Sequence, residues 1–213
     1  MGKTRVMIVD DQRLARQYFE LVMAQSDRYE IVHLVESATF ADTYVLRNGV
    51  DLVLMDVLMA DGSSSFDAAE RIKRLKPRVK VIMVTSIPEA SWMDEARSRG
   101  VDGFWYKEST AETVLSVMDR VMAGESVYPA APPDTKVGFA SSSELTSREV
   151  EILRALVDGL SNDEIAERLH LAPSTVKTHM RHLLEKTGCE NRTQLALTAR
   201  TSGLVVGAAE IGL

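Results

Sequence analysis

The chain has 213 residues, of which 45% are hydrophobic and 26% charged, and its formal net charge is −6 at pH 7. This composition is typical of a globular protein, and the length allows two small domains, each with its own core. The acidic balance argues against a protein that coats nucleic acid over its whole surface, and the single Cys189 excludes an internal disulfide. The first apolar run, 6–9, is too short for a signal peptide or a membrane span, so we expect a cytoplasmic protein without a membrane partner.

Short apolar runs alternate with helical patterns through the first half of the chain. Five such runs predict strands, over residues 6–9, 31–35, 52–55, 81–84 and 104–106. Helical periodicity follows each run, over residues 12–26, 37–49, 66–75, 89–99 and 110–123. Because buried strands that alternate with helices form parallel sheets, residues 1–124 are predicted to be an α/β domain with a doubly wound, five-stranded parallel sheet.

Four of the predicted strands end in polar residues of a specific kind. Asp10 and Asp11 follow the first strand, Asp56 the third, Thr85 the fourth and Lys107 the fifth. Ligands of open parallel sheets bind at the carboxyl ends of the strands, and clustered carboxylates require a cation among them, so the three aspartates predict a Mg²⁺ site. Asp56 can then attack a phosphoryl group whose oxygens bind Thr85 and Lys107. Each residue alone fits a helix cap, a loop hydroxyl or a solvated charge; the combination favours the phosphoryl site.

These motifs resemble those of the receiver domain of two-component response regulators, and the resemblance covers about residues 3–124. It implies a flavodoxin-like fold in which Asp56 is the phosphoacceptor, supplied by a sensor histidine kinase. It also implies that Phe104 is a switch aromatic that moves inward when Thr85 is drawn to the phosphoryl group, although Phe104 fits a plain core position equally well. The loop at 60–65 departs from the short Met-Pro loop that such domains usually have.

A different pattern begins after the first domain. Residues 125–143 are rich in proline, glycine and serine without an apolar period, which predicts a linker. Four helical patterns follow, over residues 147–157, 162–169, 174–186 and 193–200, so residues 144–213 are predicted to be a small all-α domain of four helices. The second and third of these helices, with a short turn between them and Pro173 in the first turn of the third, match a helix-turn-helix.

The second helix of this pair has a polar face. Ser174, Lys177, Thr178 and Arg181 recur at spacings of three and four and therefore share one side of the helix. Such a face fits a major groove, where lysine and arginine reach guanine or phosphate and threonine touches a thymine methyl. Between residues 170 and 200, five basic residues stand against two acidic ones. Composition alone leaves a protein-interaction module as an equal alternative.

The motifs favour DNA binding over that alternative. Residues 145–149, 159–166, 175–179 and 191–193 resemble the LuxR-type DNA-binding domain, over about residues 144–205. The resemblance implies that Lys177, Thr178 and Arg181 lie in the major groove. It also implies contacts to the DNA backbone from a further five residues: Ser174, Thr175, Asn162, Arg192 and Thr193. His179 and His182 are one helical turn apart, but no third ligand is near in sequence, which favours packing or phosphate contact over a metal site.

A receiver, a linker and a LuxR-type domain are the layout of the NarL/FixJ subfamily of response regulators. We therefore predict a transcription factor, not an enzyme, that binds two-fold operator DNA as a homodimer after Mg²⁺-dependent phosphorylation of Asp56. An aspartyl phosphatase usually carries Asp-x-Asp on one strand, whereas Val57 and Leu58 follow Asp56. A ligand-gated LuxR-type regulator needs an apolar pocket for a small molecule and has no need of the acidic set, the three aspartates Asp10, Asp11 and Asp56. A regulator of the same layout that works without phosphorylation is the main alternative.

Overall fold

The computed structural model describes residues 2–89, 91–107 and 112–205, and the chain forms two compact units. The first unit comprises Met1–Ser86 and Ala90–Ala131, and the second comprises Ile87–Glu89 and Pro132–Leu213. The main division, after Ala131, falls within the predicted linker at 125–143. Within the described ranges, no helix has both the length and the hydropathy that a membrane crossing requires.

The first unit is an α/β domain in which strands and helices alternate. Its described strands are β1 (Thr4–Val9), β2 (Tyr29–Val35), β3 (Leu52–Asp56), β4 (Lys80–Thr85) and β5 (Gly103–Tyr106). The helices that follow them in turn are α1 (Arg13–Ala24), α2 (Ala41–Asn48), α3 (Ser65–Leu75), α4 (Ser91–Ser98) and α5 (Val114–Met122). The sheet order is β2-β1-β3-β4-β5 and all neighbouring strands are parallel. The predicted doubly wound five-stranded sheet is confirmed.

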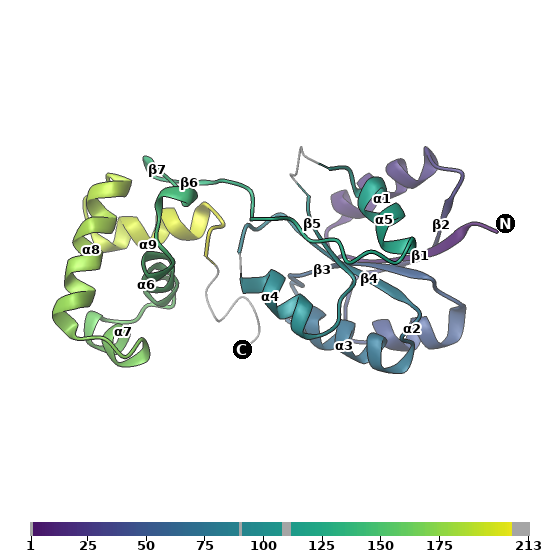
Figure 1. Cartoon of the computed structure of the whole chain (residues 1–213), viewed down its shortest axis with the longest axis horizontal. Helices are drawn as coiled ribbons and strands as arrows, with labels where there is room; N and C mark the ends of the chain where they lie inside the picture. The colour runs from purple at the N-terminus through teal and green to yellow at the C-terminus, as the bar shows by residue number, and fades with distance from the viewer. Residues whose placement is uncertain (1, 90, 108–111, 206–213) are drawn as a thin grey trace. The chain divides into compact units, whose positions relative to one another are not determined.

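Helices cover both faces of this sheet, with α1 and α5 on one face and α2, α3 and α4 on the other (Figure 1). The central strand β3 is therefore buried along its whole length, which explains its unbroken apolar sequence. Phe19 of α1 and Met118 of α5 belong to the same buried cluster as Ile8 of β1. These side chains pack α1 and α5 against the sheet.

Local signals in the sequence set where several helices begin and end. The Ser64 hydroxyl accepts a hydrogen bond from the Asp67 amide at the start of α3, and the Thr113 hydroxyl accepts one from the Ser116 amide at the start of α5. Gly49 ends α2 with a φ of 61°, a conformation that glycine adopts without strain.

The second unit contains the predicted helical domain. Its described α-helices are α6 (Ser147–Val157), α7 (Asn162–Arg168), α8 (Pro173–Thr187) and α9 (Arg192–Thr201). Capping boxes open two of them, with Thr146 and Glu149 at α6 and Ser161 and Glu164 at α7. The core of the domain includes fully buried side chains from all four helices: Ile152, Ile165, Val176, Leu183 and Leu195.

The predicted linker range contains ordered structure that its composition does not signal. A short antiparallel hairpin joins β6 (Lys136–Val137) to β7 (Ala140–Ser141), and a single 3-10 turn follows over Ser142–Glu144. The Asp134 carboxylate accepts hydrogen bonds from the Ser141 and Ser142 hydroxyls at 2.9 and 2.8 Å. Strands of two residues are too short to show an alternating pattern, which is why the sequence predicts only a linker here.

Candidate functional sites

The predicted phosphoryl-site residues come together at the carboxyl edge of the sheet. Asp10 directly follows β1, Asp56 is the last residue of β3, Thr85 is the last residue of β4, and Lys107 directly follows β5. Asp10, Asp56 and Thr85 are each at most 4% exposed. The parallel topology explains the convergence, because the carboxyl ends of all strands meet at one edge.

Lys107 binds both buried carboxylates of this edge. Its ammonium lies 2.8 Å from Oδ2 of Asp10 and 2.8 Å from Oδ2 of Asp56, and its backbone amide donates to the Thr85 carbonyl at 2.8 Å. Burial lowers the pKa of Lys107, but the charge of Asp56 and the hydrogen bonds that the ammonium donates to both carboxylates outweigh burial, so that the pKa is raised. Lys107 is therefore a fixed cation at neutral pH, directed at the Asp56 carboxylate.

Three carboxylates at this edge have the composition of a site for a hard divalent cation. One oxygen each from Asp10, Asp11 and Asp56 lies within 4.8 Å of the others. Oδ2 of Asp11 accepts a hydrogen bond from the Ala60 amide at 2.8 Å, whereas Oδ1 is buried without a hydrogen-bond partner. A buried carboxylate oxygen that lacks a partner is costly, and a cation bound by three carboxylates would satisfy it. These residues fit Mg²⁺.

The pKa of Asp56 is raised to about 6, mainly by burial and further by the charge of Asp10, while Lys107 opposes the shift. An aspartate in the unfolded chain titrates near pH 3.9. The folded state therefore binds the proton more tightly, and stability falls as the pH rises between the two values. At pH 7 the ionised Asp56 therefore destabilises the folded domain.

We therefore expect Asp56→Asn to raise the free energy of unfolding of the first unit at pH 7 by about 1–3 kcal/mol without divalent cations, and by much less at pH 4. Urea unfolding followed by tryptophan fluorescence measures this transition, because both tryptophans, Trp92 and Trp105, lie in the first unit. A variant that is less stable than the wild type at pH 7 would contradict the burial-driven shift.

The unusual loop after β3 is fastened to the loop before α2. The Ser63 hydroxyl donates to Asp61 at 2.6 Å and accepts from the Ala38 amide at 3.1 Å. The same loop supplies the Ala60 amide that binds Asp11. Ser63 thus helps to hold a backbone donor against the acidic set, a role that the sequence pattern does not reveal because Ala38 and Ser63 are 25 residues apart.

Sequence reasoning also missed the residues that orient Asp10. The Gln12 amide donates to Oδ1 of Asp10 at 2.9 Å, and the Arg16 guanidinium donates to the Asp10 carbonyl at 2.7 Å. Their positions at the start of α1 carry no motif of their own. Phe104, the predicted switch aromatic, is fully buried, and its ring centroid is 5.2 Å from that of Tyr106.

The helix-turn-helix residues lie in the second unit. His170, with a φ of 51°, makes the turn between α7 and α8, and the Leu171 amide donates to the Ala166 carbonyl at 2.8 Å. Pro173 occupies the first turn of α8, as the sequence predicts. The apolar residues of α8 pack into the core of the unit: Val176, Met180, Leu183 and Leu184. The opposite face of α8 is therefore left for contacts with a partner.

Four of the predicted DNA contacts form the exposed face of α8: Ser174, Lys177, Thr178 and Arg181. The other predicted contacts differ in exposure. Thr175 and Asn162 are partly buried, whereas Arg192 and Thr193 are exposed at the start of α9. The Arg192 guanidinium donates to the Leu160 carbonyl at 2.7 Å and so ties α9 to the loop before α7.

No metal cluster forms around His179 and His182 among the described residues, where the three aspartates of the first unit are the one group of potential ligands. His182 is exposed and His179 is partly buried on α8. Packing or contact with a phosphate thus stays the preferred interpretation of the two histidines.

Two family models match the chain. The response regulator receiver domain matches residues 6–119, and the luxR family of bacterial regulatory proteins matches residues 143–199. The response regulator protein VraR of Staphylococcus epidermidis is 32% identical over 209 residues, which cover 94% of this chain and 98% of that protein. VraR of Staphylococcus aureus is 31% identical over the same shares.

Solved structures share the fold. RcsB from Salmonella enterica serovar Typhimurium, bound to the promoter rprA in the presence of BeF₃⁻, has a TM-score of 0.58 at 18% identity and covers 92% of this chain and 98% of its own. ChrA, the response regulator of a heme-sensing two-component system, has a TM-score of 0.51 at 24% identity and covers 94% of this chain and 98% of its own. With both family matches and the VraR relatives, the chain belongs to the two-component response regulators of the NarL/FixJ type, which join a receiver domain to a LuxR-type DNA-binding domain.

Proposed function

We propose that a sensor histidine kinase phosphorylates Asp56 with the help of Mg²⁺, and that the phosphorylated chain binds two-fold operator DNA as a homodimer. The observation that carries this proposal is the acidic set of Asp10, Asp11 and Asp56 with one lysine among them. Three carboxylates against one ammonium leave negative charge uncompensated at a largely buried edge, which a purely structural role does not explain. A site for a cation and a phosphoryl group does.

In the transfer step, a carboxylate oxygen of Asp56 forms a bond to phosphorus. The bond from phosphorus to the imidazole nitrogen of the kinase histidine breaks, and the released imidazole regains a proton from water. Asp10, Asp11 and Asp56 would hold Mg²⁺, which when bound neutralises charge on the phosphoryl oxygens. Lys107 stabilises the same oxygens by its charge, and the Thr85 hydroxyl donates a hydrogen bond to them.

The output of the switch is binding, so the protein acts as a transcription factor rather than as a classical enzyme. The phosphoryl group adds negative charge beside Thr85 and shifts an existing equilibrium between inactive and active conformations. The exposed face of α8 then enters the major groove, with Lys177, Thr178 and Arg181 at the base edges. Contacts from Ser174, Thr175, Asn162, Arg192 and Thr193 to the DNA backbone complete the interface. Operator binding requires that the protein acts in the cytoplasm.

The experiment that tests this function measures molar mass by size-exclusion chromatography with light scattering. The purified chain is incubated with Mg²⁺ and beryllofluoride, beside an Asp56→Ala control. We expect a shift from monomer to dimer that requires both beryllofluoride and an intact Asp56.

Each other outcome separates the proposed steps. A chain that binds beryllofluoride but stays monomeric would contradict dimerisation in solution and favour pairing on DNA. No uptake by the wild type would contradict the phosphorylation step and favour the regulator that works without phosphate.

A further inference from the structure

The first residues of the predicted linker (125–143) lie beside β5. Val127 forms a parallel bridge with Gly103, where the Phe104 amide donates to the Val127 carbonyl at 2.8 Å and the Val127 amide donates to the Asp102 carbonyl at 3.0 Å. The first residues after α5 are therefore paired with β5, the strand that leads directly to Lys107.

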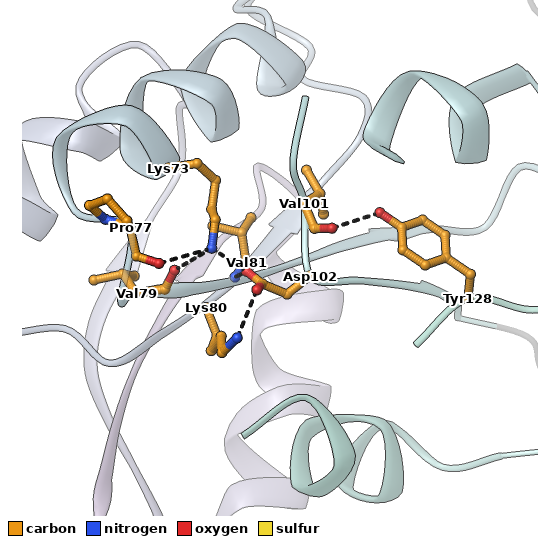
Figure 2. Close-up of polar contacts among 8 residues, drawn as sticks. All are labelled: Lys73, Pro77, Val79, Lys80, Val81, Val101, Asp102 and Tyr128. Carbon is orange, nitrogen blue, oxygen red and sulfur yellow. Dashed lines mark hydrogen bonds and ion pairs between the residues drawn. The ribbon is translucent and has the colours of Figure 1, made fainter. Parts of the chain in front are cut away.

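Tyr128 fastens this segment a second time. Its hydroxyl donates to the Val101 carbonyl at 2.9 Å (Figure 2). Its ring lies nearly parallel to the Phe104 ring, with the centroids 6.4 Å apart and an angle of 24° between the planes. The guanidinium carbon of Arg97 lies 4.4 Å from the centroid of the Tyr128 ring, within the range of a cation–π contact. Tyr128 thus joins the beginning of the linker to α4 and to the buried Phe104.

The backbone to which Tyr128 is anchored is itself firmly held. The Asp102 carboxylate accepts hydrogen bonds from the Lys73 ammonium at 2.7 Å, the Lys80 ammonium at 2.9 Å and the Val81 amide at 2.9 Å (Figure 2). The Val101–Asp102 backbone is therefore a fixed point. Burial raises the pKa of Tyr128 to about 12, so its hydroxyl stays protonated and remains a donor at neutral pH.

The Tyr128 hydroxyl is held by the Val101 carbonyl, so the face of the Tyr128 ring is the part that can respond to its neighbour Phe104. Phe104 is fully buried, so any change in its side-chain conformation must displace the rings that pack against it. Those rings include Tyr106, at 5.2 Å and edge-on, and Tyr128, at 6.4 Å and stacked. Of the two, Tyr128 is the one that lies at the start of the linker.

We propose that Tyr128 is a positioning residue that couples the conformation of Phe104 to the first residues of the linker, through the stack of the two rings. This inference rests on the proposed phosphorylation of Asp56. A movement of Phe104 in response to the phosphoryl group changes the stack, and the change loosens or tightens the pairing of Val127 with β5. Tyr128 then transmits the phosphorylation state of Asp56 from Phe104 to the start of the linker.

Hydrogen exchange of the full chain, with and without Mg²⁺ and beryllofluoride, tests this coupling. The Phe104 and Val127 amides are the donors that pair β5 with the linker, so their exchange reports the opening of that pairing. We expect beryllofluoride to change exchange at both amides in the wild type, and Tyr128→Leu to lose the change while still binding beryllofluoride. Tyr128→Phe keeps the stack and is expected to retain the change. Tyr44→Leu, at a partly exposed tyrosine of α2, is the matched control and should behave as the wild type.

The outcomes separate this inference from the function on which it rests. A wild type that does not bind beryllofluoride overturns the phosphorylation proposal and the coupling together. A wild type that binds it without any change at the two amides overturns the coupling alone. Retention of the full change in Tyr128→Leu, or its loss in Tyr128→Phe, overturns the ring stack as the coupling element.

Discussion

The variant Asp56→Asn is expected to take up no phosphoryl group from acetyl phosphate and Mg²⁺, under conditions in which the wild-type chain becomes phosphorylated. An amide does not act as the nucleophile in this transfer. Intact-mass spectrometry measures the uptake directly.

The matched control for this variant is Asp61→Asn. Asp61 is an exposed carboxylate in the loop after β3, and its Oδ1 accepts hydrogen bonds from the Ser63 amide and hydroxyl. Asparagine keeps an oxygen acceptor at that position, so this variant should be phosphorylated as the wild type is. Phosphorylation of Asp56→Asn to the wild-type level would show that another residue is the acceptor.

The largest effect expected in the second unit is a loss of DNA affinity in Arg181→Ala. Arg181 is exposed on α8, and its nearest charged partner, Glu185, lies 3.9 Å away with both side chains about two-thirds exposed. Such a surface ion pair contributes little, so DNA can replace it without a large penalty. A lost base contact costs about 1–3 kcal/mol. We therefore expect the dissociation constant for selected operator DNA to be roughly 5- to 150-fold higher.

The control for this prediction removes the same charge elsewhere in the second unit. Arg148 of α6 pairs with Glu151 at 2.7 Å and is not on the predicted DNA face. Fluorescence anisotropy at fixed salt should find Arg148→Ala close to the wild type and Arg181→Ala much weaker. Equal losses in both variants would show that net charge, rather than the face of α8, governs affinity.

The residues of the proposed phosphoryl site could be placed at one edge of the sheet from the sequence, because each of them ends or directly follows a buried strand. An apolar run that ends at Asp56 or Thr85 shows both the strand and the edge at which the residue lies. Parallel topology then brings these residues together without any knowledge of side-chain contacts. The exposed face of α8 was accessible for a similar reason, since helical periodicity assigns Lys177 and Arg181 to the side opposite the core.

Contacts between segments that are distant in the sequence could not be predicted in this way. The Ala60 amide reaches Asp11 across 49 residues, and the Tyr128 hydroxyl reaches the Val101 carbonyl across 27. Neither contact leaves a period or a motif, because each depends on how two loops meet in space. The β6–β7 hairpin was not predicted for another reason: Gly138 and its neighbours have the composition of a turn-rich linker.

The affinity of the full chain for selected operator DNA, measured with and without Mg²⁺ and beryllofluoride in the wild type and in Asp56→Asn, tests the central claim most directly. If the acidic set is the switch for DNA binding, beryllofluoride tightens binding by the wild type and leaves Asp56→Asn unchanged. Equal affinity of the wild type in both states, or tightening that persists in Asp56→Asn, would contradict control by phosphorylation of Asp56.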